Sequence, residues 1–138
     1  MTTSKIAVQV VRSGIAIIIG EVLLYAGTWF IQERIFHHIT YSDSVLTLIG
    51  AGVLTPLAAV IAGFAVALVA GARPYLHVVP MSALIIAETA YLYSRGLVDG
   101  PIWFEASAGA SLILGAVLGA FLWLHSRNSS HARVGGLV

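Results

Sequence analysis

The stretch GAGVLTPLAAVIAGFAVALVAG, Gly50 to Gly71, is continuously apolar and carries no charged side chain. A helix needs about 20 predominantly apolar residues to cross the hydrocarbon core of a bilayer. Frequent Gly and Ala are also typical of membrane helices, because small residues let neighbouring backbones approach closely. The stretch therefore predicts a membrane-spanning helix, which we place at about residues 45–70.

The composition of the whole chain supports the same solvent. The 138 residues are 59% hydrophobic and only 9% charged, whereas soluble domains have about 25% charged residues. A net charge of +1 without a basic cluster argues against a nucleic-acid partner. The absence of cysteine excludes disulfides, thiolate metal sites and cysteine nucleophiles. We expect the main partner of the chain to be a lipid bilayer.

Three further apolar segments flank this helix, which gives spans at about 13–32, 45–70, 76–95 and 103–125. Helices are favoured over strands because every backbone polar group in lipid must be hydrogen-bonded internally. We therefore predict an all-α fold, a four-helix transmembrane bundle that forms one domain over residues 1–126. Residues 127–138 are polar and then Gly-rich, and we expect them to form a flexible tail.

The orientation follows from the distribution of basic residues. In this four-span arrangement five lie on one side and two on the other, and the side richer in Lys and Arg is cytoplasmic. Both termini are thus expected in the cytoplasm. The five are Lys5, Arg12, Arg73, Arg127 and Arg133, and the two are Arg34 and Arg95.

Small residues mark the expected packing faces of the second and fourth helices. Gly63 lies within the opening stretch, and Gly115 and Gly119 are one helical turn apart in SAGASLILGAVLGAF. Such spacing places small residues on one face, where another helix can pack closely.

Two glutamates, Glu21 in IIIGEVLLY and Glu88 in LIIAETAY, interrupt apolar helices near mid-membrane depth. A charge there is costly, so we expect both side chains to be protonated at rest and to face the bundle interior. Tyr25 is four residues from Glu21, and Tyr91 is three residues from Glu88, so each tyrosine shares a helix face with its glutamate.

Three interpretations of these carboxyl groups remain open. They could form a proton or cation relay, as intramembrane acids do in transporters. They could instead hydrogen-bond neighbouring helices within the bundle. In the third interpretation, one of them contacts a polar group of a partner protein.

The consecutive His37 and His38 could form an external metal patch with Glu33 and Asp43, or simply belong to an exposed loop. Neighbouring residues of a helix point about 100° apart, so two consecutive histidines seldom bind one metal. The loop interpretation is favoured, and no metal site is predicted.

His77 and His125 are expected at similar depth, as a pair of haem ligands would be. Histidines near a membrane interface are a simpler reading, so no cofactor is predicted. The sequence contains neither G-x-S-x-G nor H-E-x-x-H, and we expect no enzymatic activity.

The second half of the chain resembles a group of small bacterial four-helix integral membrane proteins without an assigned activity. That resemblance implies a multi-pass protein of the bacterial inner (cytoplasmic) membrane. The matching residues are Gly63, Phe64, Ala67, Gly71, Arg73, His77, Pro101 and Trp103.

The stretch GEVLLYAG, Gly20 to Gly27, is also similar to the first helix of the small multidrug-resistance exporters, which carries a functional glutamate. The rest of the chain departs from that family, with longer loops and a second glutamate, Glu88, in a segment expected to be a membrane helix. We treat this similarity as an analogy.

The leading functional expectation is a non-catalytic accessory or scaffold subunit that binds other membrane helices. The alternative is a homo-oligomeric, proton-coupled transporter of small molecules or ions that uses Glu21 and Glu88. The partners are accordingly other membrane-protein subunits or further copies of the chain.

Overall fold

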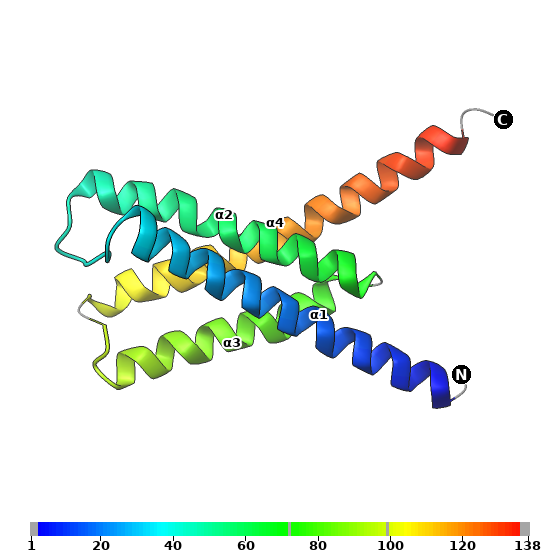
Figure 1. Ribbon diagram of the computed structural model, residues 1–138, viewed down its shortest axis with the longest axis horizontal. Coiled ribbons are helices and arrows are strands. Elements are labelled where there is room, and N and C mark those ends of the chain that lie inside the picture. Colours follow the sequence, from blue (N-terminus) through cyan, green and yellow to red (C-terminus); the bar gives the residue numbers. More distant parts are fainter. Residues whose placement is uncertain (1–2, 72, 99, 136–138) are drawn as a thin grey trace.

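The computed structural model describes residues 3–71, 73–98 and 100–135, and all of its regular structure is helical (Figure 1). Four long helices follow one another, and the first continues directly into a short π-helical segment, η1. Their bounds are α1 Thr3–Phe30, η1 Ile31–Ile35, α2 Val45–Ala70, α3 Tyr75–Ser94 and α4 Ile102–Gly135.

The prediction of four apolar helices is confirmed, because all four are long and apolar enough to span a membrane. The bounds of α2 match the expected range, and those of α3 differ by one residue at each end. The outer helices are longer than expected: α1 begins at Thr3 and α4 continues to Gly135. Most of the expected tail is thus helical, and its last three residues lie outside the described part of the chain.

Local signals in the sequence explain where α2 begins and ends. The Ser44 hydroxyl accepts a hydrogen bond from the Thr47 backbone N–H at 3.2 Å, which caps the first turn. Gly71 ends the helix with a φ of 72°, a conformation that glycine adopts without steric cost. Pro56 and Pro80 lie inside α2 and α3.

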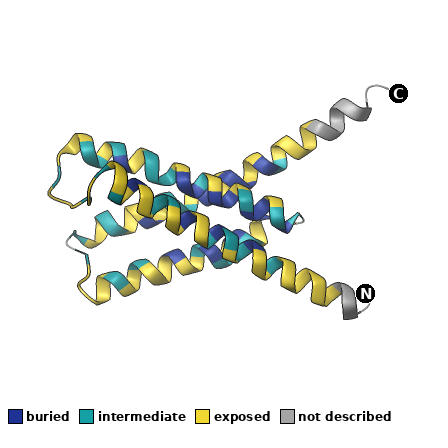
Figure 2. Ribbon diagram, in the orientation of Figure 1, coloured by how far each residue is buried: buried dark blue, intermediate teal, exposed yellow. Residues whose placement is uncertain are grey.

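The helices form an elongated bundle with two distinct ends (Figure 1). We call the end with both termini and the α2–α3 turn the terminal end. The opposite end holds the loops 36–44 and 95–101, and we call it the loop end. Near the middle the helices cross, and there the buried residues gather, while the described residues of the protruding part of α1 are mostly exposed (Figure 2).

The closest packing in the bundle joins α2 to α4 through glycine. A methyl group added at Gly63 would collide with the carbonyl group of Ala116, and one added at Gly119 would collide with the carbonyl oxygen of Val60. At Gly115 it would lie 2.7 Å from the carbonyl oxygen of Pro56. The three glycines expected to mark packing faces therefore all lie in this interface, where the two backbones are in contact.

Where α1 meets α2 and α3, the packing is instead made by side chains. Met81 of α3 and Val66 of α2 are the largest fully buried side chains among the described residues. Both lie against Gly20 of α1: an added methyl group there would collide with Val66 and lie 3.5 Å from the Met81 sulfur. Beyond this contact α1 and α3 diverge toward the loop end (Figure 1).

Candidate functional site

Three glutamates from three different helices line one cavity between α1, α3 and α4. The cavity has a volume of about 680 Å³, and we call it the glutamate cavity. Glu21 comes from α1, Glu88 from α3 and Glu105 from α4. A volume of this order is typical of sites for small molecules.

The three carboxyl groups lie at successive depths from the loop end. At a rise of 1.5 Å per residue, Glu105 is about 5 Å along α4 from its first residue, and Glu88 is about 9 Å before the end of α3. Glu21 is about 14 Å before Phe30, the last residue of α1. Glu21 and Glu105 are half-buried, whereas Glu88 is exposed, contrary to the expectation that it faces the bundle interior.

None of the three carboxyl groups forms an ion pair in the described part of the chain, where Glu33 is the one glutamate that contacts a histidine, His38. The Oε1 atom of Glu21 is buried and has no hydrogen-bond partner among the described residues. A buried polar atom without a partner costs free energy that a bound ligand or water would recover. The described side chains therefore supply no counter-charge to the cavity.

The two tyrosines expected to accompany the glutamates have different positions. Tyr25 lines the cavity, although its side chain is 68% exposed. Tyr91 does not line it and instead lies below the guanidinium group of Arg95, 5.8 Å from the ring centroid. Thr28 and Thr89 also line the cavity, but their hydroxyls donate to carbonyl groups within their own helices.

A second cavity of about 660 Å³ adjoins the first at the loop end, and we call it the loop cavity. It is lined by parts of both loops, including Thr40, Tyr41 and Val98. Residues common to both cavities show that they are contiguous. The shared residues are Gln32, Leu92, Glu105 and Ala108.

Three aromatic rings gather beside the loop cavity. The ring of Tyr41 meets Trp103 and Phe104 edge to face, with centroid distances of 5.8 and 5.4 Å. Trp103 and Phe104 meet in the same way at 6.0 Å. These contacts fix the α1–α2 loop against the start of α4.

Toward the terminal end the glutamate cavity is closed by the packed core. Ala16, Val66 and Met81 are each 0% exposed. Ala16 precedes the cavity residues of α1, Met81 precedes those of α3, and Val66 lies near the end of α2. Apolar side chains therefore separate the carboxyl groups from the terminal end.

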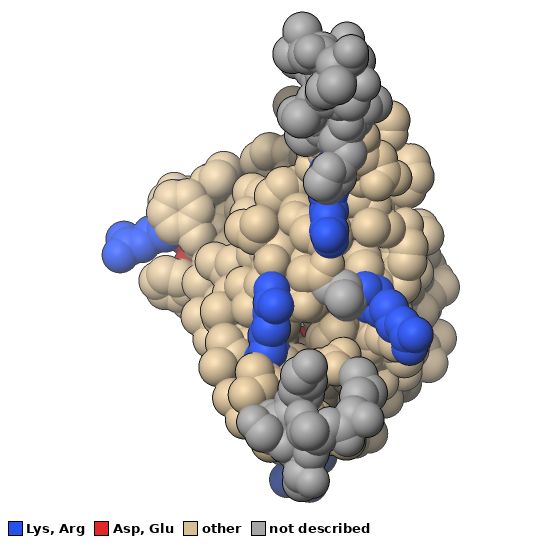
Figure 3. Space-filling model, turned by 90° about the vertical axis from the view of Figure 1, so that its right-hand side faces the viewer, with Lys and Arg blue, Asp and Glu red and all other residues tan. Residues whose placement is uncertain are grey.

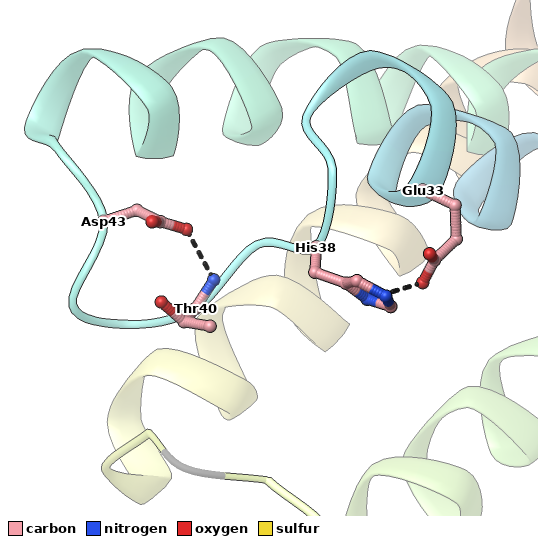
Figure 4. A network of polar contacts seen from close by, with 4 residues as sticks. All are labelled: Glu33, His38, Thr40 and Asp43. Carbon is pink, nitrogen blue, oxygen red and sulfur yellow. Dashed lines mark hydrogen bonds and ion pairs between the residues drawn. The ribbon is translucent and has the colours of Figure 1, made fainter.

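Of the two consecutive histidines in the α1–α2 loop, His38 forms a local contact (Figure 4). His38 Nδ1 lies 2.9 Å from Glu33 Oε1, and the Thr40 N–H donates to Asp43 Oδ2 at 2.6 Å. Glu33 and Asp43 thus contact different residues of the loop. No group of three His, Asp or Glu side chains in the described part of the chain could hold a metal ion.

His77 and His125 have separate surroundings. His77 Nε2 lies 2.9 Å from the Ser13 hydroxyl, and its Nδ1 lies 3.2 Å from the Arg73 carbonyl oxygen. His125 stacks on Phe121 at a centroid distance of 6.3 Å. His77 therefore links α1 to α3 near the terminal end.

Glu105 is the site residue that sequence reasoning missed. Its place at the start of the last apolar segment is that of an extramembrane acid, so it does not stand out in the sequence. Gly109, four residues later, also lines the cavity, and this i, i+4 relation places both on one face of α4. A glutamate preceding a small residue by one turn was the signal available in the sequence.

Comparison with known proteins adds no family to this description. No protein-family model, curated protein or solved structure matches the chain. The function therefore has to be inferred from the chemistry of the cavity itself.

Proposed function

We propose that this multi-pass membrane protein binds a small organic cation in the glutamate cavity and exchanges it for protons. The observation that carries the proposal is the convergence of Glu21, Glu88 and Glu105 on one cavity without a described basic partner. Intramembrane carboxyl groups that face a cavity are typical of substrate and proton pathways.

Proton coupling follows from competition for the same carboxyl groups. In apolar surroundings a carboxyl group is cheaper to hold protonated than ionised. A cation that enters the cavity stabilises the ionised form and therefore displaces a proton. Binding of the cation and binding of the proton then oppose each other, which is the requirement for exchange.

The shape of the site favours an organic cation over a metal ion. The three carboxyl groups are not grouped closely enough to hold a metal, while the cavity volume of about 680 Å³ suits a small molecule. Tyr25 and Trp29 add aromatic surface to the cavity wall, and aromatic faces attract organic cations.

Proton release on binding is the direct test. The purified protein in weakly buffered detergent solution is titrated with methylammonium and with tetraalkylammonium ions of increasing size, while a pH-sensitive dye reports released protons. We expect release with the wild type and its loss in Glu21→Gln. Glu33→Gln, which alters a glutamate outside the cavity, is the matched control and retains release. Absence of release for every cation, or unchanged release in Glu21→Gln, Glu88→Gln and Glu105→Gln, contradicts the proposal.

Orientation is part of the same proposal. The terminal end carries Arg12, Arg73 and Arg127, and an excess of Lys and Arg marks the cytoplasmic side. Both termini are then cytoplasmic, and the loop cavity opens away from the cytoplasm, in the bacterial inner membrane that the resemblance implies. Reactivity of a cysteine introduced at Ser42, compared with one at Ser129, toward a membrane-impermeant thiol reagent tests this orientation.

An accessory or scaffold role is the second candidate, and one feature favours it. Arg12 lies level with the end of α2, because it donates to the Val69 carbonyl oxygen. The part of α1 before Arg12 therefore continues past α2 and carries exposed aliphatic side chains that a partner protein would cover. These are Ile6, Val8, Val10 and Val11, which are 50–66% exposed.

Native mass spectrometry of the complex extracted from its own membrane separates the two candidates. A stoichiometric mass of unrelated chains supports the accessory role, whereas a monomer or homo-oligomer supports the exchanger. Replacing Val8 and Val11 with serine should release a partner that covers this segment, while Val45→Ser and Leu46→Ser, at exposed positions of α2, should not.

A further inference from the structure

Arginines from three segments gather where α2 ends. The Nε atom of Arg12, in α1, donates to the Val69 carbonyl oxygen at 2.5 Å. Arg127, in α4, donates from Nη1 to the Gly71 carbonyl oxygen at 2.7 Å. Arg73 follows in the α2–α3 turn and is exposed. Figure 3 looks onto this end and shows basic side chains around it, with acidic ones barely visible.

Two of the three guanidinium groups are held in place against one residue. A methyl group added at Gly71 would lie 2.5 Å from Arg12 Nη2, and the Gly71 carbonyl oxygen accepts from Arg127. Arg127 also lies over the ring of Trp123, 5.4 Å from its centroid, and Trp123 is only 8% exposed. Arg12 and Arg127 therefore both contact the same end of α2, where their side chains donate to its last carbonyl groups.

The contacts within the described part of the chain do not pair this positive charge with a carboxylate. Carbonyl groups at the end of a helix attract arginine side chains, which accounts for one N–H of Arg12 and one of Arg127. Each guanidinium group has five N–H donors, so several remain. No carboxylate in the described part of the chain forms an ion pair with Arg12, Arg73 or Arg127.

We propose that Arg12, Arg73 and Arg127 form a site for the phosphate of an anionic phospholipid headgroup. Arginine binds phosphate oxygens through two parallel N–H donors. The site lies where α2 ends and α3 begins, which is the level of the lipid headgroups if these helices span the bilayer. Basic pockets between transmembrane helices are typical binding places for anionic headgroups.

Titration with defined lipids in native mass spectrometry tests this site. Phosphatidylglycerol and phosphatidylcholine with identical acyl chains are added to the delipidated full-length protein in detergent. We expect preferential binding of phosphatidylglycerol. Arg73→Gln should weaken that binding about fivefold, the factor expected for one basic residue near a membrane surface. The Arg73 side chain makes no hydrogen bond or ion pair among the described residues, so its replacement should leave unfolding in lipid-free detergent unchanged.

Arg34→Gln is the matched control, because Arg34 is an exposed arginine at the loop end. It should retain the wild-type preference for phosphatidylglycerol. An equal loss in Arg34→Gln and Arg73→Gln would show a general effect of charge and contradict the site, as would equal binding of both lipids by the wild type.

A separate arm distinguishes the source of the phosphate. Inorganic phosphate is added to the lipid-free protein, and thermal unfolding is followed with sulfate-free chloride buffer as the reference. Stabilisation by inorganic phosphate without a lipid preference would identify a soluble anion as the ligand and overturn the lipid assignment. Lipid preference without stabilisation by inorganic phosphate supports it.

Discussion

The two sides of α4 differ in how they meet their neighbours. On the side toward α2, the contact is made at glycines, which have no side chain. The backbones of α2 and α4 therefore touch at Gly63, Gly115 and Gly119. Toward α1 and α3, α4 contributes Glu105 to a cavity of about 680 Å³. In lipid there is no hydrophobic driving force between helices, so their association depends on van der Waals packing. Small residues favour that packing because they let the backbones approach closely. One helix thus supports the stability of the bundle on one face and its chemistry on another.

The largest effect should come from filling the close interface. In Gly63→Ala the added methyl group collides with the carbonyl group of Ala116, and α2 and α4 must separate to admit it. Overpacking costs about 1–3 kcal/mol, and we expect the upper end because the obstacle is backbone. Equilibrium unfolding of the protein in mixed micelles, followed by circular dichroism, measures the loss.

Gly52→Ala is the matched control in the same helix, since nothing lies within 4 Å of a methyl group added there. It should unfold at the wild-type midpoint or slightly above it, because alanine favours helices. Equal destabilisation by both substitutions would show that helix propensity, and not the contact with Ala116, governs this interface.

An intermediate effect is expected at Gly20, where the packed core closes the glutamate cavity. The methyl group added in Gly20→Ala meets the side chains of Val66 and Met81. Side chains can yield where backbone cannot, and methionine is particularly adaptable, so we expect a loss of about 1 kcal/mol. Gly14→Ala, in open space on the same helix, is the control for the same unfolding measurement.

Combining Gly20→Ala with Val66→Ala sharpens this result. The second substitution removes the atoms that the new methyl group meets. The loss of unfolding free energy in the double variant should therefore be smaller than the sum of the losses in the two single variants. Strict additivity would place the strain of Gly20→Ala elsewhere in the bundle.

The smallest effect on stability should follow from replacing the deepest carboxyl group. Glu21 Oε1 is buried without a hydrogen-bond partner among the described residues, so Glu21→Leu breaks no recorded contact. We expect the free energy of unfolding to stay within about 1 kcal/mol of the wild type, while proton release on cation binding is lost. A destabilisation above about 2 kcal/mol would instead support the interpretation of Glu21 as a link between helices.

Helix number and position were readable from the sequence because length and apolarity decide them. α2 and α3 were placed to within one residue, and their ends coincide with Ser44, Gly71 and Ser94. The ends of α1 and α4 were not, because Arg12 and Arg127 were read as the limits of the apolar segments. A helix can leave the membrane without ending, and polar residues outside lipid remain helical when their backbone bonds are satisfied within the helix.

The candidate site was only partly readable. Glu21 and Glu88 stand out because each interrupts an apolar run, whereas Glu105 follows a loop and blends with it. Whether three side chains share a cavity depends on how the helices rotate and cross, and spacing within one helix does not contain that information. Tyr91 is another example. Its spacing from Glu88 predicts a shared helix face, yet its ring lies beside Arg95 and does not line the cavity.

The pairing of α2 with α4 also has a consequence for biosynthesis. The close neighbour of α2 is α4, which is synthesised last. While α3 is being synthesised, the face of α2 that carries Gly63 is therefore still uncovered. A chain interrupted before α4 would carry Glu21 and Glu88 but lack the wall that contains Glu105. The bundle and its acidic interior are therefore completed by the same event, the insertion of the last of the four helices.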